Sequence, residues 1–386
     1  MLFEEKKRDF FGPKNYVETS YSYLDRSSRP ESRRVREFID NWIGIYPNAE
    51  TDELIARLRS PDTRSFDSAI FELIIFATMS RLGCTVSVHP ELDNDTGARP
   101  DFLISDSSGI EFYLEAVLAS EYSQAEISAE KRKNVVLNAL DEMESPNFFL
   151  GITAHGNPET PPSSRRLRNN LSQWLSTLDP DEVGAEIDSV GSSALPLFTW
   201  NHEDWQIKFE AWPRSTDKRG PGKRTIGALS GGGRFLNTWE PIRDAVRSKG
   251  NHYGDLVKPL LVAINVNAVS VDRIDEMEGL FGQEEYVFDR DDSSSPPQMR
   301  RKPNGAWYVA SGPQYTRVSG VWIFADMNPW NIVSRRNTVY LNPWARLELP
   351  EIVRSLNHAS LAGTKMRWED GTPLAEVLEL PQHWPE

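Results

Sequence analysis

The sequence predicts an α/β protein in which a mixed, largely parallel sheet is flanked by helices. Patterns typical of strands alternate with patterns typical of helices along the chain, which favours this fold class. Residues 258–266 and 320–325 are apolar runs without alternation, as expected of strands buried on both faces. Residues 67–82 form a strongly apolar helical segment that ends at Gly83, a residue that commonly terminates helices.

The remaining elements follow from hydrophobic periodicity and turn residues. Helices are predicted at residues 31–45, 52–59, 67–82, 128–143, 165–178 and 238–249. Strands are predicted at residues 85–88, 100–105, 111–119, 147–154, 205–212, 258–266 and 320–325. The turn Asp-Ser-Ser-Gly at 106–109 joins the second and third strands, and residues 289–301 are expected to form a polar linker or surface loop.

Three regions are expected along the chain. Residues 1–35 are polar and rich in Arg, Ser and Tyr, which predicts a loosely held N-terminal arm. Residues 36–180 would form the core of the fold. Residues 181–386 would add strands, a glycine-rich basic loop at 214–250, and turns rich in Pro and Trp, all packed on the same core.

The composition excludes several classes of protein. Residues 259–271, an uncharged and largely apolar stretch of the C-terminal half, are too short and too polar to span a bilayer, and the N-terminus lacks the apolar core of a signal peptide. Cys84 is the only cysteine, and the six histidines are scattered without metal-ligand spacing. We therefore expect a cytoplasmic protein without a membrane partner, a disulfide framework or a cysteine-rich zinc site.

The charge of the chain is unevenly distributed. The formal net charge is −14, which argues against a protein coated in phosphate contacts. Residues 214–249 nevertheless carry nine Lys or Arg and three acids. By base rate such a stretch is a solvated loop, but it is also the strongest candidate for a nucleic-acid contact. The candidate contact residues are Lys218, Arg219, Lys223, Arg224, Arg234 and Lys249.

Two carboxylates occupy positions where a carboxylate needs an explanation. Asp101 opens one predicted strand and Glu115 lies within the next, so a tight hairpin would bring them together at one end of the sheet. The sequence around Glu115, Phe-Tyr-Leu-Glu-Ala-Val-Leu-Ala, is apolar on both alternating faces, which is typical of a covered central strand. Glu72 is similarly surrounded by apolar residues within the 67–82 helix. A buried carboxylate must be paired, protonated or bound to a cation.

A divalent cation would account for these residues. Mg²⁺ takes oxygen ligands and is commonly held by one or two carboxylates together with substrate phosphate. The predicted ligands are Asp101, Glu115 and the carbonyl of Ala116, for Mg²⁺ or Mn²⁺. Structural alternatives remain open: Glu72 as an early-turn acid favoured by the helix dipole, Asp101 as a turn or cap residue, and Glu115 as a member of an ion pair, for example with Arg99.

The helix with Glu72, followed by strands bearing Pro100-Asp101 and Glu115, resembles the PD-(D/E)XK nuclease superfamily over roughly residues 65–155. The resemblance implies a restriction-endonuclease-like core in which Asp101 and Glu115 hold the metal and Glu72 assists. The lysine of the family, expected two positions after the glutamate, is replaced by Val117. Some family members carry an equivalent group on a neighbouring element. Lys133 is the preferred candidate for it, ahead of Lys131 and Lys249.

The resemblance implies a metal-dependent endonuclease that hydrolyses phosphodiester bonds of nucleic acid, with DNA as the expected partner and defence against foreign DNA as a biological setting. The alternative is a catalytically inactive relative that binds nucleic acid or acts as a scaffold, which Val117 favours. Strandedness, sequence preference and oligomeric state are left open by the sequence, with a homodimer among the arrangements.

Overall fold

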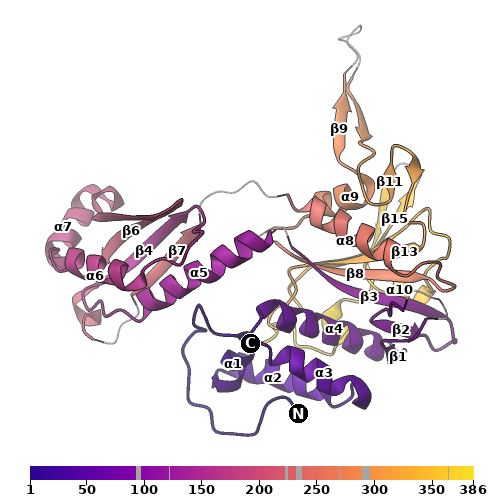
Figure 1. Ribbon diagram of the computed structural model, residues 1–386, viewed down its shortest axis with the longest axis horizontal. Coiled ribbons are helices and arrows are strands. Elements are labelled where there is room, and N and C mark those ends of the chain that lie inside the picture. The colour runs from indigo at the N-terminus through magenta and orange to yellow at the C-terminus, as the bar shows by residue number, and fades with distance from the viewer. Residues whose placement is uncertain are drawn as a thin grey trace. The chain divides into compact units, whose positions relative to one another are not determined.

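The computed structural model describes residues 1–92, 97–120, 122–221, 225–231, 237–268, 270–288, 296–363 and 365–386. The chain forms two compact units (Figure 1). The first unit comprises Met1–Gly12, Thr19–Glu121 and Leu236–Glu386. The second unit comprises Pro13–Glu18 and Tyr122–Phe235. Most of the second unit is therefore an insertion into the chain of the first.

A mixed sheet organises the first unit. Its eight strands, counted over the described residues, lie in the order β1-β2-β3-β8-β13-β14-β15-β16. These strands are β1 (Thr85–Val88), β2 (Phe102–Ser105), β3 (Glu111–Ser120), β8 (Leu260–Asn267), β13 (Val318–Ala325), β14 (Asn337–Leu341), β15 (His358–Ala362) and β16 (Lys365–Glu369). The pairs β3–β8, β8–β13 and β14–β15 are parallel, and the other neighbours are antiparallel. The prediction of a mixed sheet flanked by helices is confirmed, but the sheet is not largely parallel, because among the described strands only three of its seven neighbouring pairs are parallel.

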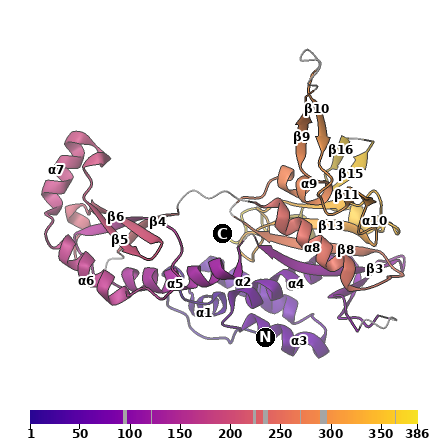
Figure 2. The same cartoon turned by 45° about the horizontal axis from the view of Figure 1, so that its top comes forward.

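One face of this sheet packs on helices from the N-terminal part of the chain (Figures 1 and 2). These are α2 (Pro30–Ile43), α3 (Asn48–Leu58) and α4 (Thr63–Arg81). Helix α4 begins after Asp62, whose side chain accepts a hydrogen bond from the Ser65 amide at 3.2 Å, and it is followed by Gly83 in the left-handed conformation. Its apolar side chains pack against β2, β3, β8 and β13 in one hydrophobic core.

The opposite face packs on α8 (Trp239–His252) and α9 (Arg273–Phe281). Side chains alternate between the two faces along each central strand, so Phe112 and Leu114 of β3 lie in the α4 core while Tyr113 lies in the α8 core. Helix α8 lies between β3 and β8 in sequence and forms the helix of a parallel crossover.

Shorter elements complete the first unit. They are α1 (Ser20–Arg26), α10 (Glu351–Arg354), α11 (Leu374–Val377), the hairpin of β9 (Glu284–Val287) with β10 (Gln298–Arg301), and the pair β11 (Tyr308–Val309) with β12 (Gly312–Pro313). The predicted loop at 289–301 thus contains a strand at its end, while 289–295 lie outside the described residues. No helix within the described ranges is long and apolar enough to cross a membrane.

The first 35 residues differ from the expected loose arm. Leu2 and Phe3 are buried in the core of the first unit, and α1 and the beginning of α2 lie within this segment. The Leu2 amide donates a hydrogen bond to the Asp40 carboxylate at 2.5 Å. The polar composition concealed these few apolar anchors, which are sufficient to fix the backbone on the N-terminal helices.

The second unit has its own sheet and core. The sheet has the order β5-β6-β4-β7 among the described residues, with β6 antiparallel to β5 and β4, and β7 parallel to β4. Its strands are β4 (Phe148–His155), β5 (Leu197–His202), β6 (Trp205–Pro213) and β7 (Ile226–Gly231), and its helices are α5 (Gln124–Asp141), α6 (Ser164–Leu175) and α7 (Pro180–Val190). Short 3-10 turns at Ser192–Ala194 and Thr216–Lys218 connect them.

The expected boundaries at 36–180 and 181–386 differ from this division. The second unit begins within the first of these regions and ends within the second. The basic segment 214–249 is also divided: β7 lies in its first part, in the second unit, and α8 forms its last part, in the first unit. Sequence patterns identify elements, but which strands share a sheet depends on pairings distant in sequence.

Phe71 provides a test of the α4 core. It is buried and meets Phe324 of β13 edge to face, with ring centroids 5.0 Å apart and planes at 82°. Phe71→Ala should lower the free energy of unfolding by about 3–5 kcal/mol because it leaves a cavity between helix and sheet. Phe11→Ala, at a ring that is 65% exposed, should change stability by less than about 1 kcal/mol. Chemical denaturation of both variants checks this contrast.

Candidate metal centre

Asp101 and Glu115 lie together where the antiparallel ladder of β2 and β3 ends. The last ladder pair is Phe102 with Leu114, so Asp101 precedes β2 at the position next to Glu115. The Asp101 amide donates to Glu115 Oε2 at 3.2 Å. The Ala116 amide donates to Asp101 Oδ2 at 2.7 Å. Each carboxylate is therefore held by the backbone of the other strand, and the predicted juxtaposition is present.

The carbonyl of Ala116 belongs to the same corner. The N–H and C=O of one strand residue point to the same side of the strand. Since the Ala116 amide points to Asp101, its carbonyl faces the side of β3 on which Asp101 lies. The three predicted oxygen ligands, Asp101, Glu115 and Ala116, thus come from two adjacent strands at one end of the ladder.

The side chain of Glu115 is directed toward α8. Lys249 Nζ lies 2.5 Å from Glu115 Oε1, and the hydroxyl of Tyr253 donates to Glu115 Oε2. Lys249 and Tyr253 are four residues apart at the C-terminal end of α8, a spacing that places both on the same side of the helix. Glu115 is only 3% exposed. Inside the core its carboxylate is paired with Lys249 and hydrogen-bonded to Tyr253, as a buried charge requires.

Glu72 approaches from the opposite face of the sheet. It lies on α4 and pairs with Arg57 of α3, which donates Nη1 to Glu72 Oε2 at 2.7 Å and Nη2 to Glu72 Oε1. The hydrogen bond with Glu72 raises the pKa of Arg57 above its usual range. Glu72 is near enough for its charge to act on Asp101, but its own charge is already compensated by a two-pronged ion pair.

Asp101 is the carboxylate of this group without a cation of its own. Burial raises its pKa well above the usual range, and the negative charges of Glu115 and Glu72 raise it further. The hydrogen bond from the Ala116 amide and the positive charge of Lys249 lower the pKa of Asp101, but they do not offset this increase. Among the described residues no Lys, Arg or His forms an ion pair with Asp101, because Arg57 pairs with Glu72 and Lys249 with Glu115.

The structure distinguishes among the three candidate lysines. Lys249 contacts Glu115 directly. Lys133 instead donates to Asn157 Oδ1 at 2.8 Å within the second unit, and Lys131 lies on the same helix, α5. We therefore transfer the candidate role from Lys133 to Lys249. Val117 lies two residues after Glu115 on β3, so both side chains point to the sheet face that packs on α8. A lysine of α8 can therefore reach Glu115 from the side on which a lysine at position 117 would lie.

A groove adjoins Lys249. It has a volume of about 400 Å³ and is lined by residues 117–120 at the end of β3, by Asn237 just before α8, and by one side of α8 from Glu240 to Lys249. Glu240 and Asp244 lie along this groove. It gives the lysine side of the carboxylate corner access to solvent.

A second buried carboxylate in the same unit shows what a balanced arrangement looks like. Glu276 of α9 accepts a hydrogen bond from the Tyr340 hydroxyl at 2.5 Å and pairs with Arg336 at 2.6 Å. Burial raises the pKa of Glu276, while Arg336 and Arg273 lower it. The ion pair and the hydrogen bond resemble those of Glu115, but no second carboxylate stands beside Glu276 as Asp101 stands beside Glu115. We assign Glu276 a structural role.

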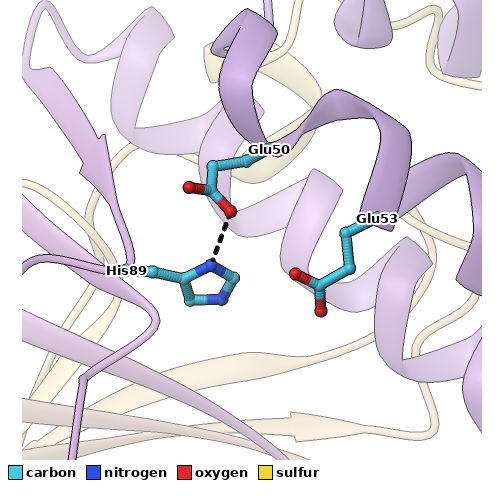
Figure 3. Close-up of side chains that lie close together, drawn as sticks. All are labelled: Glu50, Glu53 and His89. Carbon is cyan, nitrogen blue, oxygen red and sulfur yellow. Dashed lines mark hydrogen bonds and ion pairs between the residues drawn. The ribbon is translucent and has the colours of Figure 1, made fainter.

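Another group of possible metal ligands lies next to the corner (Figure 3). One ligand atom each from Glu50, Glu53 and His89 falls within 4.8 Å of the others. His89 Nδ1 already forms a hydrogen bond with Glu50 Oε2 at 3.0 Å, and the His89 amide donates to the carbonyl of Asp101 at 2.9 Å. The hydrogen bonds account for the position of His89, and Glu53 is exposed, so we assign this group no function.

The candidate nucleic-acid contacts are dispersed. Lys218 is exposed, and Arg219 pairs with Asp181 of α7 at 2.6 Å. Lys249 is occupied by Glu115, as described above. The other three candidates, Lys223, Arg224 and Arg234, lie outside the described residues. The structural alternative of an ion pair at Glu115 is present with Lys249 rather than with the suggested Arg99, which pairs with Glu91 at 2.7 Å.

Arg57 and Tyr253 were missed by the sequence analysis. Tyr253 could have been found from its i,i+4 spacing to Lys249 on an amphipathic helix. Arg57 had no comparable signal, because its pairing with Glu72 depends on how α3 packs against α4.

No family model, no curated protein and no solved structure matches the chain.

The raised pKa of Asp101 has a measurable consequence. The folded protein retains the Asp101 proton above the pH at which the unfolded chain releases it, so this group lowers stability as pH rises from about 4 through the folded pKa. Asp101→Asn should abolish that loss and stabilise the metal-free protein near neutral pH by about 1–3 kcal/mol. Unfolding free energies measured from pH 4 to 8 in chelator-containing buffer test it.

Asp106→Asn is the matched control. Asp106 is an exposed turn carboxylate whose pKa is lowered by hydrogen bonds from the Ser108 side chain and the Ile110 amide. Its replacement should not stabilise the protein near neutral pH. Equal stabilisation by both variants would show that general reduction of negative charge, rather than the buried corner, is responsible.

Proposed function

We propose that the chain is a metal-dependent nuclease that hydrolyses phosphodiester bonds of nucleic acid, with Mg²⁺ or Mn²⁺ held at the Asp101–Glu115 corner. The observation that carries this proposal is the position of Asp101, a half-buried carboxyl group with a raised pKa that forms no ion pair with a described residue and stands next to the buried carboxylate of Glu115. Bringing two carboxylates together in a buried position is costly unless a cation is shared between them.

The donor set fits a hard divalent cation. Asp101 and Glu115 supply carboxylate oxygens and Ala116 supplies a carbonyl, which are the ligand types that Mg²⁺ prefers. A bound divalent ion would polarise the scissile phosphate and lower the pKa of an attacking water. Three protein ligands are sufficient, because substrate phosphate and water would complete the coordination of the ion.

Lys249 supplies the positive group that Val117 cannot. In the metal-free arrangement it neutralises Glu115. With Glu115 engaged as a ligand, Lys249 would be released toward the adjoining groove, where an ammonium group can stabilise negative charge on phosphate oxygens. Tyr253 keeps the Glu115 carboxylate oriented, and the Arg57–Glu72 pair fixes α3 against α4 beside the site.

A non-catalytic protein is the second candidate. Both oxygens of Glu115 already have protein partners: Lys249 contacts Oε1, and the Tyr253 hydroxyl and the Asp101 amide contact Oε2. A satisfied ion pair of this kind can serve the fold alone. In that case Glu115 would not exchange Lys249 for a metal ion, and the chain would act by binding rather than by cleavage.

Cleavage assays separate these candidates. Incubation with labelled DNA and RNA, single- and double-stranded, should give Mg²⁺- or Mn²⁺-dependent products with the wild type. Asp101→Asn and Lys249→Met should each reduce the rate by at least about 100-fold, because each removes electrostatic stabilisation from the reacting phosphate. Lys258→Met is the control for lysine removal: Lys258 pairs with Glu111 at the beginning of β3 and should be dispensable.

The absence of cleavage under all four substrate conditions, with either metal, would reject the catalytic proposal in favour of the binding candidate. Loss of activity in Lys258→Met as large as that in Lys249→Met would remove the specific role of Lys249.

Metal titration tests the exchange of Lys249 for a divalent ion. Lys249→Met leaves Glu115 and Asp101 without positive charge, so the variant should bind Mn²⁺ about tenfold or more tightly than the wild type and should be less stable without metal. Asp101→Asn should abolish binding. Calorimetric titration of the three proteins with Mn²⁺ provides the measurement, and equal affinities in wild type and Asp101→Asn would place the ion elsewhere.

A further inference from the structure

The sheet of the second unit has two unlike faces. One face carries alternate side chains that pack with α5, α6 and α7 in the core of the unit, for example Leu150, Ile207 and Phe209. The other face, which we call the open face, carries the intervening residues of β5, β6 and β4. Within the described residues of this unit, the core cluster lies entirely on the helix side, and the open face consists of exposed and half-buried side chains.

Two aromatic rings lie side by side on the open face. Phe149 of β4 is directly opposite Trp212 of β6 in the antiparallel register. Their ring planes are parallel to within 6° and their centroids are 6.1 Å apart. Both are half-buried. A solvated sheet face normally carries polar side chains at such positions, so a parallel aromatic pair near the end of the β4–β6 ladder requires an explanation.

Glycines on the same face make room for these rings. A Cβ at Gly227 would lie 2.3 Å from the Phe149 ring, and a Cβ at Gly151 would lie 3.2 Å from the Trp212 indole nitrogen. The space that two side chains would take is thus occupied by the rings. The neighbouring row carries Glu210 together with the exposed side chain of Leu197 opposite it.

Charged and hydroxyl side chains lie on the same face, with the Gly151–Glu210 row next to the pair and the Thr153–Lys208 row beyond it. Lys208 is exposed and lies between Thr199 and Thr153 in the cross-strand register. The guanidinium of Arg214 lies 5.9 Å from the Phe149 centroid. Glu210 is the acidic residue between Lys208 and Trp212 on β6. The open face therefore combines aromatic rings, positive charge and neutral hydroxyls over a short distance.

We propose that the open face binds single-stranded nucleic acid by stacking bases on Phe149 and Trp212, while Lys208 and Arg214 contact the phosphate backbone. The ligand class rests on the proposed nuclease function, and the site itself is separate from the metal centre. Base stacking needs exposed base faces, which a duplex hides inside its own stack, and any base offers one. A surface for protein docking would be expected to show a broader apolar patch, whereas these two rings are bordered by charged and hydroxyl side chains.

Binding is measured by fluorescence anisotropy with labelled 20-nucleotide single-stranded DNA, single-stranded RNA and 20-base-pair duplex DNA, on the full chain, with chelator present to prevent cleavage. Wild type should bind at least one single strand about tenfold more tightly than the duplex. Trp212→Leu and Phe149→Leu should each weaken single-strand binding about tenfold or more. Lys208→Gln, at an exposed residue that should not affect folding, should reduce the log–log salt slope by about 0.7.

Trp174→Leu is the matched control. Trp174 of α6 stacks with Phe198 at 5.4 Å on the helix side of the unit, so its loss perturbs the unit without touching the open face. Binding retained in Trp174→Leu and lost in Trp212→Leu supports the proposal. Equal losses in both, equal affinity for duplex and single strand, or absence of binding to every probe would overturn it. Single-strand binding by a wild type that cleaves none of the substrates with either metal would reject only the nuclease function.

Discussion

The carboxylate of Glu115 is placed in the middle of a sheet whose two faces are covered, and the surrounding structure is arranged to make that charge tolerable. A charge in this position costs several kcal/mol unless a partner reaches it. The strand itself cannot provide one, because its neighbours on both faces are apolar. The partner comes from α8, which must therefore dock with its C-terminal end, bearing Lys249 and Tyr253, directly over β3.

This requirement is met despite a long interruption of the chain. Strand β3 and helix α8 are consecutive elements of a parallel crossover, yet nearly all of the second unit is inserted between them. Both units are compact because each has its own sheet and its own core. The contacts of Glu115 with Lys249 and Tyr253, together with the apolar side chains of α8, hold the crossover helix on the sheet.

The contrast between Glu115 and Glu276 shows which buried charges invite a functional explanation. Each is buried beside a tyrosine hydroxyl and a cationic side chain. Glu276 is complete with these partners, and its arrangement stabilises the packing of α9 on β14. Glu115 has Asp101 next to it, and the raised pKa of Asp101 makes that carboxyl group hold its proton beside the Glu115–Lys249 pair. A second carboxyl group that is forced to hold its proton is the feature that separates a candidate cation site from an ordinary ion pair.

The sequence by itself determined the α/β class, most helices and strands of the first 155 residues, and the meeting of Asp101 with Glu115. Local signals are sufficient there, because a short turn fixes the register of β2 on β3 and burial follows from the alternation of apolar residues. Tertiary structure alone decided that Lys249 reaches Glu115, that Arg57 compensates Glu72, and that residues 122–235 form a separate unit with its own sheet. These outcomes depend on which helix packs on which face of the sheet and on pairings between strands distant in sequence. Neither produces a periodic pattern of residues that could be recognised in the sequence.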